Sequence, residues 1–465
     1  MFGLFDSLEI GRKSLLAQQA ALEVTGNNIA NVNTPGYHRQ RAILEETAPM
    51  PTGIGELGTG VTVSQVRSVR DQFLELRISQ ATQNVAMQDA VAAYLRQVGT
   101  AFGSGNNSIQ EDLSRFFNSF STLATDPASS PLRYGVVSAA QNLAASFREA
   151  AQQLVDVQDQ ANAAAEQTVS EINELTGRIA QLNMQIASGE AGGSDAATLR
   201  DQRSLALNEL AAAIDIHYYE ADDGTVTVST AGGDSLVTAG FVSELHTETQ
   251  PPNGYVGVFT STKEITDSIR GGKLGGLLDV RDRLIPAYQQ QLDTLAAAVI
   301  SQVNTAHSAG TDLQSPSTSP AVNLFMPAAT VAGAAAGFTV NPDVVSDVRY
   351  IAAGLSGAPG DNANALAIAA LSFQKLLSGG TQTFAESFAA LQFGIGTDEQ
   401  GAIMQSDVGN AVLTQLENSR ESYSGVSLDE EATDLIRFQR AYQAAARFVS
   451  VIDQLTEELV QTLGR

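Results

Sequence analysis

Residues 4–37 have the sequence LFDSLEIGRKSLLAQQAALEVTGNNIANVNTPGY. Within residues 4–30 an apolar side chain recurs every seven positions: Leu8, Leu15, Leu22 and Ile29. Such a repeat keeps the side chains on one stripe of a helix, where they face a partner helix. The stripe stops in an Asn-rich segment closed by Pro35-Gly36, a pair that is typical of a turn. The sequence therefore predicts a helix over residues 4–30 that ends in a shaped loop.

The opposite end of the chain carries a matching pattern. Ser427 and Glu430 have the spacing of a capping box, in which two side chains satisfy the first free N–H groups of a helix. Apolar positions then alternate steps of three and four, as in a coiled-coil seam: Leu435, Phe438, Tyr442, Ala445, Val449, Ile452, Thr456, Leu459 and Leu463. Because neither terminal stripe can bury itself alone, we expect residues 4–30 to pair with residues 428–463.

The interior of the chain changes texture twice. Helical patterns cover 69–102, 109–125, 131–187 and 195–213. Residues 217–260 alternate apolar and polar side chains between Gly-rich turns, which indicates short strands. Helical patterns return at 274–307, with a break or kink at Pro286, and then at 361–377, 383–393 and 398–424. Residues 310–345 are rich in Ser, Thr, Ala, Gly and Pro and predict a loop or a small insertion.

These patterns predict a mainly α protein. Both chain ends contribute to a long helical bundle or coiled coil, and a small β domain is inserted into it. The seam of residues 131–187 would span about 85 Å as one helix, although Gly177 weakens it. The predicted boundaries are 1–40 with 426–465 for a terminal coiled-coil domain, 41–213 with 264–310 and 350–425 for a helical rod domain, and 214–263 for the β domain, with 311–349 as a candidate addition to it.

Composition excludes several classes of function. The 465 residues include 26 Lys and Arg, 51 Asp and Glu and no Cys, so the formal net charge is −25. This charge opposes binding to nucleic acid and to anionic membranes, and the missing Cys excludes disulfides and thiolate metal sites. Residues 1–80 carry −1, residues 426–465 carry −3 and the middle carries −21. We expect the middle to face water and the ends to pack against copies of themselves.

Motifs that could carry chemistry have weak contexts. Residues 53–58 match a G-x-G-x-x-G string, but prolines precede it and a strand-like run follows, so a turn is favoured. The four His are too scattered for a helical metal pair. Asp222-Asp223-Gly224 suits a hairpin turn better than a Ca²⁺ loop. Carboxylate pairs such as Glu45-Glu46 and Glu430-Glu431 are expected to be solvated. The sequence predicts no catalytic residue, metal site or cofactor.

Targeting signals give a similar picture. Acidic residues precede the first basic one at the N-terminus, the reverse of a secretory signal peptide. No window approaches the ~18 uncharged apolar residues of a membrane helix. We expect a soluble protein, either cytoplasmic or exported by a route that leaves its N-terminus uncut.

Residues 15–37 and 424–463 closely resemble the paired terminal signatures of bacterial flagellar rod, hook and hook-associated axial proteins. Residues 271–310, 226–237 and 360–371 are similar to the members that join the hook to the filament. The resemblance implies a non-enzymatic structural subunit, secreted through the flagellar type III system. It would self-assemble outside the cell, at the hook–filament junction of the flagellum.

The resemblance also implies partners and contact residues. The partners are copies of the chain in a ring, the hook protein, a second junction protein, the filament cap protein during assembly and an export chaperone on the C-terminal helix. Neither nucleic acid nor a membrane is among them. The implied assembly residues are Leu8, Leu15, Leu22 and Ile29 with Leu435, Phe438, Tyr442, Ala445, Val449 and Ile452 in a coiled-coil layer, and Asn27, Asn28, Asn31, Asn33, Pro35 and Tyr37 in a loop against adjacent subunits.

Two alternatives stay open. One is another axial protein, a hook or distal-rod subunit, which would be richer in strand. The other is a type III secreted coiled-coil adhesin or translocator, which would not need paired terminal motifs. For a junction subunit, we expect the terminal helices to be poorly ordered in the monomer and to fold when neighbours supply the missing surface.

Overall fold

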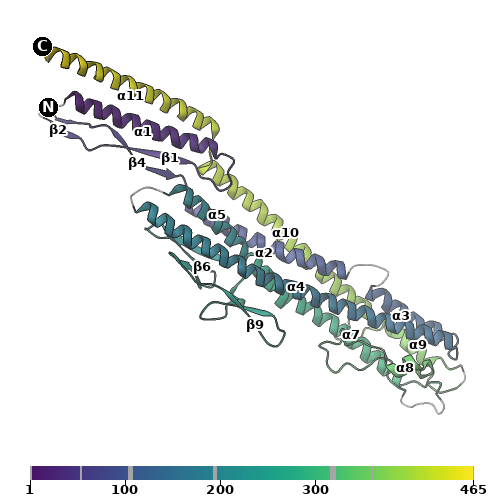
Figure 1. Cartoon of the computed structure of the whole chain (residues 1–465). Helices are drawn as coiled ribbons and strands as arrows, with labels where there is room; N and C mark the ends of the chain where they lie inside the picture. Colours follow the sequence, from purple (N-terminus) through teal and green to yellow (C-terminus); the bar gives the residue numbers. More distant parts are fainter. Residues whose placement is uncertain are drawn as a thin grey trace.

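The computed structural model describes residues 3–52, 55–102, 108–191, 196–314, 321–358 and 360–463. The molecule is long and narrow (Figure 1), and both chain termini lie at one end of it. There helix α1 (Leu4–Ala30) runs antiparallel to helix α11 (Leu428–Leu463), which confirms the predicted pairing of the chain ends. We call α1, α11 and the strands between residues 40 and 68 the arm.

The arm contains a β hairpin that the sequence did not predict as such. Strand β1 (Gln40–Glu46) pairs antiparallel with β4 (Val61–Ser68), and the short strands β2 (Met50–Thr52) and β3 (Gly55–Leu57) pair with each other. Both β1 and β4 pack on α1. Residues 41–52 and 55–68 therefore lie with the terminal helices, whereas the sequence pattern assigns 41–68 to the rod domain. Their strand pattern is weak because most of their side chains remain exposed or half-buried.

The two terminal helices meet through small side chains. The buried residues of α1 are Gly11, Ala17, Ala21, Thr25 and Asn28. A Cβ atom added at Gly11 would meet the Val449 side chain at 2.5 Å, so the backbone of α1 approaches α11 closely there. The predicted leucine stripe of α1 (Leu8, Leu15, Leu22 and Ile29) is only half-buried in the single chain. Small residues face the partner because they allow the closer approach.

The remaining helices form the rod. They are α2 (Gln72–Ala101), α3 (Ile109–Leu123), α4 (Ser130–Glu190), α5 (Ala197–Ala213), α6 (Gly272–Asp279), α7 (Ile285–Ser308), α8 (Pro342–Ser346), α9 (Ala363–Ala370) and α10 (Phe384–Ser424). Helix α4 has 61 residues, about 90 Å at about 1.5 Å per residue. It stays continuous through Gly177, and its predicted seam is fully buried except for Leu175. These elements confirm a mainly α bundle with an inserted β region.

Two clusters of buried apolar side chains hold the rod and the inserted strands. One lies toward the end far from the arm and is rich in aromatic rings that contact one another in tilted or edge-to-face geometry, including Phe116, Phe147, Phe325 and Phe338. The other joins α4, α5 and α6 to the inserted strands. The described part of residues 311–349 packs in the first cluster rather than on those strands. The expectation that this segment extends the β domain is wrong, because Phe325 and Phe338 bury themselves against α3 and α4.

A buried histidine fixes the same region. The Nδ1 of His307 on α7 lies 2.7 Å from the carbonyl oxygen of Val322, and its Nε2 accepts the N–H of Ala352 at 3.0 Å. Because Nε2 accepts, Nδ1 carries the proton and the imidazole is neutral. Burial lowers the pKa of His307 to about 4. The neutral ring therefore ties two irregular segments to α7.

The inserted strands form the β module, residues 216–259. Strands β5 (Ile216–Glu220), β6 (Val226–Thr230), β7 (Ser235–Thr238) and β8 (Phe241–Val242) make one antiparallel sheet, and β9 (His246–Thr249) pairs with β10 (Val256–Phe259). The predicted turn at Asp223-Gly224 is present: the Asp223 carboxylate accepts the N–H and hydroxyl of Thr225, and Gly224 has a φ of +78°.

Three helix boundaries differ from the prediction. Helix α10 is continuous, whereas the sequence predicts a gap after residue 393. Its buried face packs along α2 and in the first apolar cluster, and this packing outweighs the weak helix propensity of its glycines. Helix α9 is shorter than predicted: it ends at Ala370 in a 3-10 turn over Leu371–Phe373, and the chain is extended from Gln374. Pro286 causes no break, because a π-turn over Val280–Leu284 accommodates its missing N–H.

Candidate functional site: the arm and its joint with the rod

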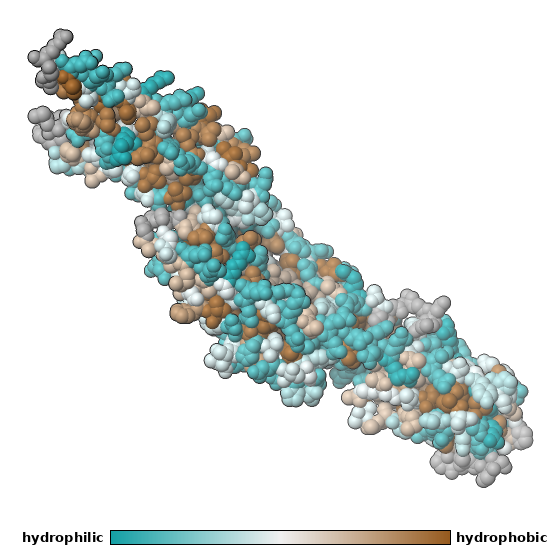
Figure 2. All heavy atoms as spheres, viewed as in Figure 1, coloured by the Kyte–Doolittle hydropathy of each residue, from teal (hydrophilic) through white to brown (hydrophobic). Residues whose placement is uncertain are grey.

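The predicted seam of α11 is only partly covered by α1. Ala445 and Ile452 are buried and Phe438 and Val449 are half-buried, whereas Leu435 and Tyr442 expose 36% and 38% of their surface. Further large apolar side chains of α11 are exposed: Leu428, Ile436, Phe448, Val451, Leu455, Leu459 and Val460. Figure 2 shows apolar residues gathered along the visible face of the arm. One helix thus presents far more apolar surface than its single partner covers.

The Asn-rich loop divides into an outer and an inner part. Asn33 and Pro35 are exposed, and Asn27 accepts a hydrogen bond from Asn31 within the same turn. Tyr37 is half-buried, and its hydroxyl donates to Asn28 at 2.8 Å. The outer residues are accessible to another molecule, as the resemblance implies. That contact stays a prediction.

Asn28 has an internal role. It is 1% exposed, and its Oδ1 accepts the backbone N–H of Gln40 at 2.9 Å as well as the Tyr37 hydroxyl. Its Nδ2 donates to the carbonyl oxygen of Gln40 at 2.9 Å and to Oε2 of Glu431 at 3.0 Å. The side chain therefore satisfies the backbone of β1 as a neighbouring strand would, and it links α1 to α11.

Arg39 completes this network from the hairpin side. Its Nε donates to Glu431 at 2.6 Å and its Nη1 to Glu430 at 2.5 Å, while its backbone N–H donates to the carbonyl of Ser424 at 2.9 Å. Glu431 is 1% exposed. The expectation that the Glu430-Glu431 pair is solvated is therefore wrong for Glu431, whose buried charge Arg39 and Asn28 compensate. For Glu430, the ion pair adds a contact that the capping pattern did not predict.

His38 connects the arm to the rod. It is 2% exposed, its Nδ1 lies 2.7 Å from Oδ1 of Asp201 on α5 and its Nε2 lies 3.2 Å from Oε1 of Glu75 on α2. Its backbone N–H also donates to Asp201 at 3.2 Å. Burial opposes the charged ring, but the two carboxylates outweigh burial and raise the pKa of His38. We call His38, Arg39 and their partners the joint.

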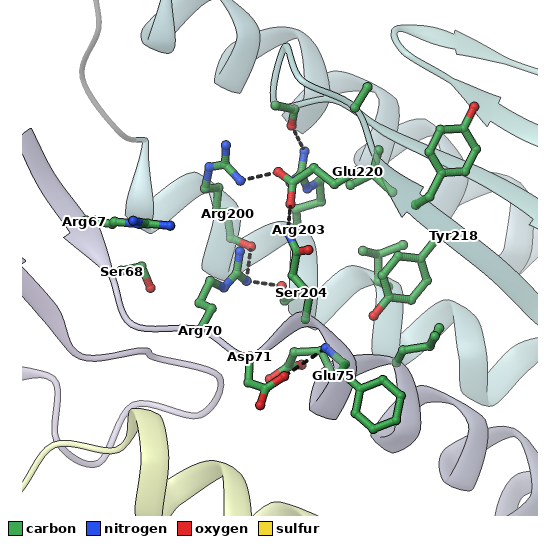
Figure 3. A pocket seen from close by; sticks show the side chains of 18 of the residues that line it. Arg67, Ser68, Arg70, Asp71, Glu75, Arg200, Arg203, Ser204, Tyr218 and Glu220 are labelled. Atoms are coloured by element: carbon green, nitrogen blue, oxygen red, sulfur yellow. Dashed lines mark hydrogen bonds and ion pairs between the residues drawn. The ribbon is translucent and has the colours of Figure 1, made fainter.

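A cleft of about 1200 Å³ opens beside the joint. The end of β4, the start of α2, α5 and β5 line it, and its labelled side chains include Arg70, Arg200, Arg203 and Glu220 (Figure 3). Burial raises the pKa of Tyr218 in its wall to about 12, so this hydroxyl stays protonated at neutral pH.

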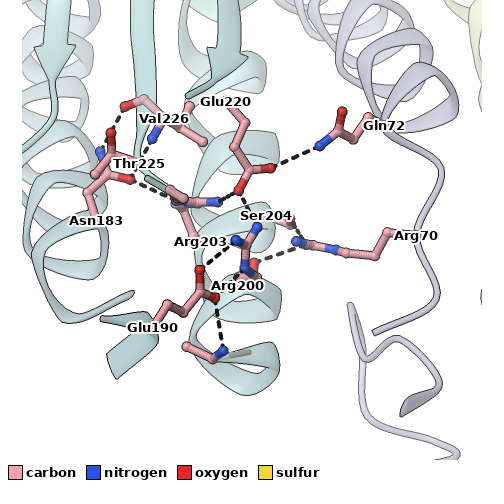
Figure 4. Close-up of polar contacts among 12 residues, drawn as sticks. Arg70, Gln72, Asn183, Glu190, Arg200, Arg203, Ser204, Glu220, Thr225 and Val226 are labelled. Atoms are coloured by element: carbon pink, nitrogen blue, oxygen red, sulfur yellow. Dashed lines mark hydrogen bonds and ion pairs between the residues drawn. The ribbon is translucent and has the colours of Figure 1, made fainter. Parts of the chain in front are cut away.

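The charges in the cleft are engaged with one another (Figure 4). Arg200 pairs with both oxygens of Glu190 at 2.7 and 2.8 Å and also with Glu220. Arg203, which is 2% exposed, donates to Glu220 at 2.9 Å and to Asn183 at 3.0 Å. Arg70 donates to the carbonyl of Arg200 at 3.0 Å. Such pairing fastens the β module and the start of α2 to α5.

The described ranges hold few other candidate sites. There, His, Asp and Glu do not gather in groups of three that could hold a metal ion. None of the helices in these ranges combines the length and the apolar character needed to cross a bilayer. The first two residues of the G-x-G-x-x-G string, Gly53 and Ile54, lie outside the described residues. Strand β3 covers Gly55–Leu57 of the string and pairs antiparallel with β2.

The sequence missed the joint. In the sequence His38 is one of four scattered His, because Glu75 and Asp201 are 37 and 163 residues away along the chain. One usable signal is its position directly after the Asn-Pro-Gly loop, since polar residues next to shaped loops often make specific contacts.

Comparisons with known proteins match the arm and the rod separately. The family model described as "Flagellar hook-associated protein FlgK helical domain" matches residues 95–325. "Flagella basal body rod protein" matches residues 8–38, and "Flagellar basal body rod FlgEFG protein C-terminal" matches residues 418–462. The last two segments supply the paired helices of the arm and some of its loop.

Relatives of similar length extend over the whole chain. Flagellar hook-associated protein 1 of Bacillus subtilis is 30% identical, covering 100% of this chain and 99% of its own length. The protein of the same name from Escherichia coli is 26% identical over 96% of this chain and 97% of its own. The solved flagellar hook junction protein FlgK from Burkholderia pseudomallei shares the fold, with a TM-score of 0.66, 18% identity and coverage of 75% of this chain and 100% of that one. The chain therefore belongs to the flagellar hook-associated protein 1 family.

Proposed function

We propose that this chain is a structural subunit of the bacterial flagellum that forms the junction between hook and filament. The observation that carries the proposal is the similarity to flagellar hook-associated protein 1 of Bacillus subtilis over the whole chain, including arm, rod and β module. The proposal includes secretion through the flagellar type III system and a position outside the cell. It excludes an enzymatic role, in keeping with the paired charges of the cleft.

Self-assembly through the arm is the mechanism that we propose. Most of the large apolar side chains of α11 are left exposed by α1, and burying one such side chain contributes about 1.5–3 kcal/mol. Neighbouring copies in a ring would cover this surface and so gain a continuous apolar layer. The predicted seam residues, with Leu435 and Tyr442 among the more exposed, would lie in that layer.

Further partners follow from the position at the junction. We propose contacts with the hook protein below, with a second junction protein above and with the filament cap protein during assembly. An export chaperone would hold α11 before secretion, because this helix carries the exposed apolar side chains that need protection in the cytoplasm. The alternative of a hook or distal-rod subunit shares the arm. A match to the rod protein FlgG of Agrobacterium fabrum, 39% identical, covers only 14% of this chain.

The outer end of the arm would gain order on assembly. The joint network holds the inner ends of α1 and α11, whereas the outer end of α11 exposes Leu455, Leu459 and Val460. We expect weak amide protection at residues 4–12 and 455–463 in the monomer, measured by hydrogen exchange. Protection there equal to that of α4 would contradict coupled folding.

Deletion of the gene, followed by electron microscopy, tests the proposed function. We expect hooks without filaments and filament protein shed into the medium. A hook or distal-rod subunit would instead leave cells without complete hooks. Filaments on normal hooks in the deletion strain would overturn both assignments.

A further inference from the structure

The arm and the rod are joined by polar contacts. Within the described residues, the two large apolar clusters draw their buried members from the rod and the β module, with none from α1, the hairpin or α11. The contacts that cross from arm to rod include those of His38 with Asp201 and Glu75, and that of the Arg39 backbone with Ser424. An apolar interface is insensitive to pH, but a buried ionic one is not.

The geometry at His38 requires a charged ring. Each ring nitrogen faces a carboxylate oxygen, at 2.7 Å for Asp201 and 3.2 Å for Glu75. A carboxylate accepts hydrogen bonds and cannot donate one, so both nitrogens must carry a proton, which only the imidazolium provides. The two carboxylates belong to different rod helices, α5 and α2, so the two N–H groups of the charged ring tie the arm to both helices.

Other charged and titratable groups face the joint from each packed element. Arg70 lies 3.8 Å from Asp201, and Arg420 of α10 acts on Glu75. Besides burial, the charge of Glu75 raises the pKa of Tyr218 on β5, and the charges of Asp201 and of Glu431 on α11 raise the pKa of Tyr37. Both tyrosines have a pKa raised to about 12, mainly by burial, so they stay neutral. Within this group, His38 is therefore the residue that changes charge near neutral pH.

We infer that His38 is a proton-controlled clamp: its charged form fixes the direction of the arm on the rod, and loss of one proton releases the arm to move about the two connections between arm and rod, residues 69–71 and 425–427. Deprotonation leaves one ring nitrogen with a lone pair facing a carboxylate, while Asp201 and Glu75 lose a buried positive charge. The inference concerns one free subunit and goes beyond the proposed joining of hook and filament.

The direction of the pH effect follows from the pKa. Burial lowers the pKa of His38, but the hydrogen bonds that its ring donates to Asp201 and Glu75 outweigh burial, so the pKa in the folded chain lies above its ordinary value of 6.5. The clamp is complete below pH 6.5 and is lost as pH rises through the folded pKa. Glu75 stays ionised across this range, since the ring lowers the pKa of Glu75 despite its burial.

The test measures the arm direction in the full-length monomer. The chain has no Cys, so Ser170→Cys on α4 and Ser450→Cys on α11 introduce two unique sites for spin labels, both on exposed helical residues. Double electron–electron resonance then gives the distance distribution at pH 6 and pH 9, with unlabelled chain added to suppress contacts between copies. In parallel, His side-chain NMR follows the protonation of His38.

The clamp predicts one narrow distance at pH 6 and a broad or shifted distribution at pH 9, with a midpoint equal to the NMR midpoint of His38. His38→Gln should show the broad distribution at both pH values. His246→Gln, at a half-exposed position of the β module, should keep the wild-type response. Equal distributions at pH 6 and pH 9 in the wild-type chain would overturn the inference even if the His38 variant does not fold. So would a pH response that persists in His38→Gln.

Discussion

The substitution Asn28→Ala tests whether the inner loop residue holds the arm together. It removes four hydrogen bonds and leaves the N–H and C=O of Gln40, a residue that is 6% exposed, without these partners. A buried backbone group left unsatisfied costs about 1–3 kcal/mol, so the arm should lose about 2–5 kcal/mol. The lower limit applies if a water molecule enters the space left by the amide.

The loss should be confined to the arm, because Asn28 contacts the hairpin, the loop and α11. Hydrogen exchange with mass spectrometry measures it. Amides of residues 25–30 and 428–434 should exchange roughly 30-fold to 4,000-fold faster, since about 1.4 kcal/mol corresponds to a factor of ten. Amides in the buried seam of α4 should not change.

Two matched variants separate the amide from its position. Asn28→Asp keeps the shape but places a carboxylate 3.0 Å from Oε2 of Glu431, so it should destabilise the arm at least as much as alanine. Asn27→Ala removes an exposed amide that bonds within its own turn and should stay within about 0.5 kcal/mol of the wild type. Equal amide exchange rates in Asn27→Ala and Asn28→Ala would contradict the role of Asn28 in holding the arm together.

Three further predictions address the arm surface, the helix contact and the far end of the rod. Leu435→Asp should abolish the joining of filament to hook, while the circular dichroism spectrum and the hydrogen exchange of the rod stay normal. Gln439→Asp, at an exposed polar position of the same helix, should still assemble. Motile cells that carry Leu435→Asp would contradict the assignment of Leu435 to the assembly seam. Gly11→Ala should destabilise the α1–α11 pair by about 1–3 kcal/mol in denaturant titrations, because its Cβ would meet a valine of α11 at 2.5 Å. At Gly26 a Cβ would have nothing within 4 Å, so Gly26→Ala should stabilise α1 by roughly 0.5–1 kcal/mol in the same titrations. Burial lowers the pKa of His307 to about 4, so the folded chain binds this proton less readily than the unfolded chain does. The free energy of unfolding should therefore fall by roughly 3 kcal/mol as pH falls from 6.5 to 4. A His307→Gln variant that loses the same stability in acid would count against this assignment.

The sequence predicted what depends on local periodicity. The pairing of the chain ends, the length of α4 and the position of the strands follow from repeats that short windows reveal. It failed where distant residues decide. Glu431 is buried because Arg39, 392 residues away, compensates its charge, and α10 stays continuous because the rod covers its buried face. His38 shows the same limit, since its charge state depends on carboxylates from two other helices.

The small residues on the inner face of α1 show a subtler limit. A step of seven in leucine predicted the stripe that faces α11, but Gly11, Ala21 and Thr25 are among the residues that the single chain buries. Periodicity identifies an apolar stripe and cannot tell which of two partners will cover it. The half-buried leucines fit a second partner from a neighbouring copy, which belongs to the proposed function.

The proposed function depends above all on where the protein lies in the flagellum. An epitope tag inserted at Asn253, in the exposed turn between β9 and β10, leaves the arm and the joint intact. Immunogold electron microscopy of isolated flagella should then place gold in a single band where the hook meets the filament. Gold along the length of the hook, at the rod or along the filament would contradict the proposed function.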